Sequence, residues 1–208
     1  LVLKPVAYKP SVKTAKENVA IRSAYHDKVY LGFAAITLLF ASCFFQLFNN
    51  LPLFFEKEMH FSKPFIGILM GANGVIIALL EMVLIYKLEG RRQNIVYITT
   101  GVFIVGLSFL LLNAPGPATI VASGMILLVT FGEILSMPFM NSYWIARTQP
   151  SNRGQYAALY TMAWSAAQTL GPMGGAQVAQ HWGFANLWWI TGGLCIITAA
   201  AFKTFIRN

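Results

Sequence analysis

The stretch T-F-G-E-I-L-S-M-P-F-M-N-S-Y-W, residues 130–144, decides the fold because it places a carboxylate inside a long apolar segment. That segment, residues 117–145, is long enough to cross a bilayer core of about 30 Å as a helix. With a rise of about 1.5 Å per residue, Glu133 lies roughly 18 Å or more from either end. An ionised group at that depth costs about 2.5 kcal/mol or more. Glu133 is therefore expected to face a cavity or a partner, or to change its protonation state.

The composition of the whole chain also indicates a membrane protein. Of its 208 residues, 57% are hydrophobic and 11% are charged, with a mean hydropathy of +0.61. Soluble domains carry about 25% charged residues. The net charge of +8 does not indicate nucleic-acid binding, because the basic residues cluster between apolar runs. Cys43 and Cys195 lie within apolar runs and are expected to be buried thiols, so we expect no disulfide, no metal site and no cofactor.

Six apolar segments predict an all-α membrane protein with six transmembrane helices. Residues 1–28 carry six Lys and Arg and few apolar clusters, which is typical of a cytoplasmic linker rather than a signal peptide. The start at Leu1 suggests the downstream part of a longer polypeptide. Residues 29–206 are expected to form the bundle, with helices at about 29–55, 65–86, 94–113, 117–145, 154–179 and 184–206.

The basic residues predict that both ends of the chain are cytoplasmic. With the leading segment inside, thirteen Lys and Arg fall on that side and only Lys57 and Lys63 on the other. Short loops rich in Lys and Arg face the cytoplasm in multi-pass proteins. The chain is accordingly expected to be an integral protein of the plasma (inner) membrane, in contact with lipid.

Polar side chains in the first helix are candidates for a ligand site. Gln46, Asn49 and Asn50 occupy positions i, i+3 and i+4, so a continuous helix places their amides on one face. Such amides avoid lipid, and either hydrogen-bond another helix or line a water-filled cavity. Pro52 is expected to bend the outer third of this helix.

The second helix combines a packing motif with a second carboxylate. Gly67 and Gly71 are spaced to let another helix approach closely. Glu81 is a second candidate carboxylate, with pairing to a loop base as the alternative. Arg91 and Arg92 in the following basic turn either mark orientation or latch helix ends at the cytoplasmic face. The third helix carries no functional ionisable group and is expected to be peripheral.

The fifth helix has the clearest pattern. Tyr160, Trp164 and Gln168 recur every four residues on one face, and either contact substrate or pack in the bundle. Small residues allow close packing of the fifth helix. A proline is expected to loosen this helix, and another to loosen the fourth helix. The residues with these roles are Gly171, Pro172, Gly174 and Gly175, with Pro138 in the fourth helix.

These motifs together resemble the C-terminal six-helix half of a major facilitator superfamily transporter. They are the first-helix stretch Phe44–Phe55, L-E-G-R-R from Leu88, G-E-x-x-x-x-P from Gly132, R-G-Q-Y-x-x-L-Y from Arg153 and L-G-P-x-G-G from Leu170. The basic turn lacks the Asp of the superfamily's D-R-x-G-R-R loop. The resemblance implies a twelve-helix transporter that alternates access to a site between two halves, with an N-terminal six-helix half upstream. It assigns the substrate or proton site to Gln46, Asn49, Asn50, Glu133, Tyr160, Trp164 and Gln168.

The resemblance favours a secondary active, exporter-like transporter of a small molecule, with protons as the coupling ion. The L-G-P-x-G-G element is similar to one in drug and proton antiporters. Glu133 followed by Pro138 is also similar to proton-coupled oligopeptide symporters, which rank second. A non-transporting membrane scaffold or receptor is the third interpretation, and it predicts that Glu133 is paired within the half. The chain carries neither the motifs of an enzyme nor the filter loop of a channel.

Overall fold

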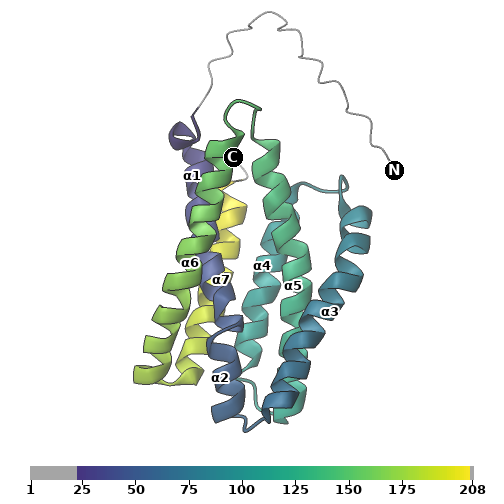
Figure 1. The fold of residues 1–208 in the computed structure, drawn as a ribbon, viewed down its shortest axis with the longest axis vertical. Coiled ribbons are helices and arrows are strands. Elements are labelled where there is room, and N and C mark those ends of the chain that lie inside the picture. Colours follow the sequence, from purple (N-terminus) through teal and green to yellow (C-terminus); the bar gives the residue numbers. More distant parts are fainter. Residues whose placement is uncertain (1–22, 207–208) are drawn as a thin grey trace, which may run out of the picture.

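The computed structural model describes residues 23–206, which form a bundle of long, roughly aligned helices (Figure 1). A short 3₁₀ helix, η1 (Ala24–His26), precedes the bundle. The first span is divided into α1 (Lys28–Phe44), the 3₁₀ turn η2 (Phe45–Leu47) and α2 (Asn50–Lys57). The remaining helices are α3 (Lys63–Leu88), α4 (Asn94–Leu111), α5 (Ala118–Ala146), α6 (Arg153–Trp182) and α7 (Phe184–Phe205).

Five helical segments of the described chain are long and apolar enough to cross a membrane. One of them is the divided first span, and the others are α3, α4, α5 and α7. Helix α6 has 30 residues, more than the roughly 20 that a span requires, but its Gln, Thr and Ser residues make it less apolar. The prediction of six helices is thus confirmed as helices, while hydropathy alone supports five as spans.

Helix α4 lies at the centre of the packing, between α5 and α7. A Cβ atom on Gly101 would lie 2.6 Å from the carbonyl oxygen of Gly132 in α5, so the two backbones touch. Gly106 makes a similar approach to Gly192 of α7. The prediction that this third span is peripheral was wrong. A helix without ionisable residues can be central when its glycines allow close contact on two sides.

The first span is interrupted at residues 45–49, just before the outer third, which was predicted to bend at Pro52. The Pro52 backbone nitrogen has no hydrogen to donate to the carbonyl of Phe48 one turn earlier, which weakens the helix there. The α-helix gives way to a 3₁₀ turn at Phe45 and resumes at Asn50. By contrast, α5 continues past Pro138 without a break.

Both ends of the described chain lie at the same end of the bundle (Figure 1). The α3–α4 and α5–α6 loops lie at that end too, so seven described bases gather there: Lys28, Lys87, Arg91, Arg92, Arg147, Arg153 and Lys203. We call it the basic end. Most of the predicted linker, residues 1–22, lies outside the described residues. Its last part is folded, since Ser23 Oγ and the backbone N–H of Ala24 both donate to Gln155 Oε1 of α6.

Cys43 of α1 and Cys195 of α7 are both buried and free, as predicted from their apolar surroundings. The structure adds that the two side chains lie close enough to interact where α1 packs against α7. They therefore belong to the core between these helices.

Candidate functional site

Glu133 lies on α5 in the middle of the membrane-spanning part, and only 6% of it is exposed. Asn73 Nδ2, from α3, donates a hydrogen bond of 3.0 Å to Glu133 Oε1. The same amide donates to Thr130 Oγ1 at 2.9 Å, and Thr130 in turn donates to the carbonyl of Ile126. One face of α5 therefore holds a small polar cluster that joins it to α3.

No positive charge balances this carboxylate within the described residues 23–206. The two ion pairs found there, Lys63–Glu56 and Arg147–Asp27, involve other carboxylates. Glu81, the second candidate carboxylate, lies on α3 and makes no ion pair within residues 23–206. A buried carboxylate without a counter-ion is stable in the membrane when it holds a proton or when a cation binds beside it.

Asn73 is the site residue that the sequence analysis missed. It is 5% exposed and sits in the run G-A-N-G of an otherwise apolar helix. The reasoning that singled out Glu133 applies to it with less force, because a neutral amide costs less to bury than a charge. The polar side chain between the glycines of α3 was the available signal.

Gln46 and Asn50 hold the interrupted first span against α6. Gln46 Nε2 donates to the carbonyl oxygen of Gly171 at 2.8 Å, and Asn50 Nδ2 donates to that of Pro172 at 3.1 Å. Asn50 Nδ2 also donates to Gln46 Oε1. Each backbone carbonyl oxygen has two lone pairs, so those of Gly171 and Pro172 can accept such a bond in addition to one within the helix. The geometry thus matches the helix-to-helix alternative for these two amides.

Asn49 does not share that face. Its side chain is exposed and donates to the carbonyl of Phe45 in the preceding turn. The spacing argument assumed a continuous α-helix, whereas the 3₁₀ turn at residues 45–47 changes the angular relation between the amides.

Tyr160 and Trp164 of α6 belong to an aromatic cluster with α1. The ring centroid of Trp164 lies 5.8 Å from Phe45, 6.0 Å from Phe44 and 6.2 Å from Tyr160. Both residues are half-buried, and Gln168, one turn further along, is exposed. Hence α6 presents a row that is packed at Tyr160 and Trp164 and open at Gln168.

The predicted site residues therefore form two groups. Glu133 is bonded to α3, whereas Gln46, Asn50, Tyr160 and Trp164 lie at the contact of the first span with α6. Within the described chain, no hydrogen bond, ion pair or ring contact joins Glu133 to the second group. A substrate that touches both groups would have to lie between α5 and the α1–α6 pair.

The packing residues also divide into two kinds. A Cβ atom on Gly171 would lie 2.6 Å from the carbonyl oxygen of Ser42, and one on Gly175 would collide with the Gln46 side chain. Gly67, Gly71 and Gly174, by contrast, have open space around them. Pro138 lines a cavity of about 350 Å³ between α3 and α5 near the basic end.

An ion pair at the basic end joins three helices. Arg147, just after α5, donates to both carboxylate oxygens of Asp27, with the shortest distance 2.9 Å. The Tyr156 hydroxyl of α6 donates to Asp27 Oδ2 at 3.0 Å, and the backbone N–H of Tyr30 in α1 donates to Oδ1. We call this arrangement the Asp27 clamp. Arg91 and Arg92, the predicted gating residues, are exposed.

Arg147→Ala is expected to lower the stability of the bundle by about 1 kcal/mol. The bond to a charged group is worth more than a neutral one, but a third of the Arg147 side chain is exposed and screened. A fall in melting temperature of roughly 3 °C follows for a chain of this size. Arg153→Ala, which removes an exposed base nearby, is the control. Equal melting temperatures for the two variants would contradict the role of the clamp.

The clamp also makes stability depend on pH. Burial alone would raise the pKa of the Asp27 carboxyl, but the bonds from Arg147, Tyr30 and Tyr156 outweigh it and hold the pKa below its usual value. The clamp therefore adds to the free energy of unfolding at pH values above the unfolded pKa of about 3.9. This stabilisation is lost as the pH falls through the pKa of Asp27 in the folded protein. The difference in melting temperature between the Arg147→Ala variant and the wild type should shrink on acidification over that range.

A helical bundle with several helices long and apolar enough to span a membrane is typical of a multi-pass membrane protein. The family model for the Major Facilitator Superfamily matches residues 1–168. The chain belongs to this superfamily, whose members are transporters of small molecules rather than enzymes. No curated protein and no solved structure gives a significant match.

Proposed function

We propose that this chain is one half of a proton-coupled, exporter-like secondary transporter, in which Glu133 binds either a proton or a cationic substrate. The observation that carries the proposal is the burial of Glu133 in α5 with an amide neighbour and no cation within the described residues. A carboxylate held in this way exchanges one positive partner for another. Binding of a cation favours the ionised form and releases the proton, which couples the two movements.

Two open helix faces support a partner half. Gly67, Gly71 and Gly74 lie along α3 with no atom within 4 Å of an added Cβ, and Gly174 of α6 is equally open. Large apolar side chains on α3 are exposed as well, among them Ile68, Val75, Leu79 and Met82. Small residues at this spacing are typical of helix contacts in membranes. We propose that helices of an N-terminal six-helix half, upstream in the same polypeptide, pack on these faces in the plasma (inner) membrane, with the basic end in the cytoplasm.

The aromatic cluster supports a lipophilic cation as the substrate. Tyr160 and Trp164 are half-buried, and Gln168 and Phe48, whose ring centroid lies 5.5 Å from that of Phe44, are exposed. Aromatic faces attract cations and apolar groups, and the attraction is stronger where water is excluded. A cationic group at Glu133 and an apolar body at these rings would together bridge the two groups of site residues.

The scaffold interpretation is favoured by one observation, the hydrogen bond from Asn73 to Glu133 within the same half. The two functions differ in whether a ligand displaces a proton. A lipophilic cation such as tetraphenylphosphonium, added to the weakly buffered full polypeptide in detergent, should release about one proton per protein, by charge compensation. Glu133→Gln should release none. Binding without proton release in the wild type would favour the scaffold or an uncoupled carrier and overturn the proposal.

A further inference from the structure

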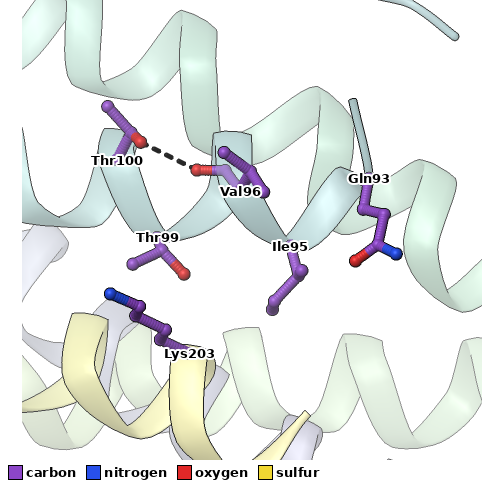
Figure 2. A pocket seen from close by; sticks show the side chains of 6 residues that line it. All are labelled: Gln93, Ile95, Val96, Thr99, Thr100 and Lys203. Carbon is purple, nitrogen blue, oxygen red and sulfur yellow. Dashed lines mark hydrogen bonds between the residues drawn. The ribbon is translucent and has the colours of Figure 1, made fainter. Parts of the chain in front are cut away.

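A second pocket lies on another face of the bundle, between the start of α4 and the end of α7 (Figure 2). Its volume is about 290 Å³. The residues that line it are Gln93, Ile95, Val96, Thr99, Thr100 and Lys203. None of the predicted substrate-site residues contributes to it, so it is separate from the transport site.

Two polar groups of this pocket have no partner within the described chain. Thr100 Oγ1 donates to the carbonyl of Val96, as a threonine in a helix commonly does. Thr99 Oγ1, one residue earlier, is buried and has no hydrogen-bond partner. Lys203 makes no ion pair or hydrogen bond with any residue in 23–206, and Figure 2 shows it facing Thr99 across the pocket. An anionic oxygen entering the pocket would pair with the Lys203 ammonium, and a rotation of the Thr99 side chain would let its buried hydroxyl donate to the same oxygen.

The charge around the pocket favours an anion. Arg91 and Arg92 immediately precede Gln93 in the chain, and no Asp or Glu is among the lining residues. The pocket also lies at the basic end of the bundle, where α4 begins and α7 ends. Basic pockets between transmembrane helices on the cytoplasmic side bind the headgroups of anionic lipids.

An apolar strip leads away from the pocket toward the opposite end. On α4, the exposed side chains of Phe103 and Leu107 follow Thr99 and Thr100 at helical spacing. On α7, Ala200 and Gly193 precede Lys203 on an exposed side, and Gly193 has open space around it. The surface next to the pocket is therefore apolar and exposed, so it can contact an acyl chain.

We propose that an anionic phospholipid binds here, with its phosphate at Lys203, Thr99 and Gln93 and an acyl chain along Phe103 and Leu107. The phosphate is the shared chemistry of a lipid headgroup and free phosphate. The exposed apolar side chains next to the pocket favour the lipid, because free phosphate has no apolar group to place against them. Such a lipid would fix α4 against α7 at the cytoplasmic surface.

The test uses the full polypeptide in detergent and native mass spectrometry of the lipid-bound fraction. Short-chain phosphatidylglycerol is compared with phosphatidylcholine of the same chains and with inorganic phosphate. We expect saturable binding of phosphatidylglycerol, about tenfold weaker in Lys203→Ala and about threefold weaker in Thr99→Val. Lys203→Arg should bind as the wild type does. Lys87→Ala, which removes an exposed base of α3 away from the pocket, is the control and should not change the affinity.

Two outcomes would overturn the assignment. Equal losses in Lys203→Ala and Lys87→Ala would mean that the lipid is attracted by diffuse charge and not by this pocket. Competition by inorganic phosphate at the concentration at which phosphatidylglycerol binds would mean that the acyl chain contributes nothing. Because Thr99→Val is close in shape to the wild type, it keeps the test decisive if the lysine variant fails to fold.

Discussion

Glu133→Gln is expected to reduce proton-driven transport by the full polypeptide to the level of empty liposomes. The amide has nearly the shape of the carboxyl group and can still accept the hydrogen bond from Asn73 Nδ2, so the contact of α5 with α3 is retained. It cannot, however, take up or release a proton in the working pH range. Uptake of substrate into proteoliposomes under an imposed pH gradient measures the effect.

The matched control is Glu58→Gln, which removes an exposed carboxylate after α2 without altering a span. It should transport as the wild type does. Size-exclusion profiles and melting temperatures of both variants should equal those of the wild type, which separates a lost function from a lost fold. Unchanged transport in the Glu133→Gln variant would remove this carboxylate from the mechanism.

Gly171→Ala is expected to destabilise the bundle by about 2 kcal/mol, in the range of overpacked interiors. The added methyl group would lie 2.6 Å from the carbonyl oxygen and 2.7 Å from the Cα atom of Ser42 in α1. Backbone atoms cannot move aside as a flexible side chain can, so α1 and α6 must separate. The bonds of Gln46 and Asn50 to the carbonyls of Gly171 and Pro172 would lengthen with them.

Gly154→Ala makes the same chemical change in the first turn of the same helix, where an added methyl group meets nothing within 4 Å. It should leave the stability of the described chain unchanged or raise it slightly, because alanine favours helix. The melting temperature of each purified variant, followed by tryptophan fluorescence, decides the comparison. Equal values for the two would show that the α1–α6 contact is looser than the structure has it.

The helices were predictable because each apolar run is long and its ends carry clear signals. Predicted and observed ends agree within a few residues, for example 117–145 against Ala118–Ala146. Pro52 predicted a bend in the outer third of the first span, and the structure places the break just before it, at residues 45–49. The central place of α4 was not predictable, because it depends on the pairing of Gly101 with Gly132 and of Gly106 with Gly192 across helices. Nothing in one helix says which other helix its glycines will meet.

The sequence could identify single residues of the candidate site, but it could not predict which of them lie next to one another. The cost of burying a charge singled out Glu133, and the structure shows it buried. Its neighbour Asn73 comes from another helix, and the sequence gives no register between the two. The Asp27 clamp is a further case, since Asp27 and Arg147 are 120 residues apart and each alone reads as an ordinary loop charge.

Coupling of transport to protons is the central claim, and one measurement tests it most directly. The full polypeptide in proteoliposomes is given a lipophilic cation and, side by side, di- and tripeptides, with and without an imposed pH gradient. We predict that the cation moves in the direction opposite to the flow of protons, and that a protonophore, which removes the gradient, abolishes this movement. Peptide uptake driven by the gradient would instead establish the symporter alternative, and movement of neither substrate, or movement indifferent to the gradient, would contradict the account.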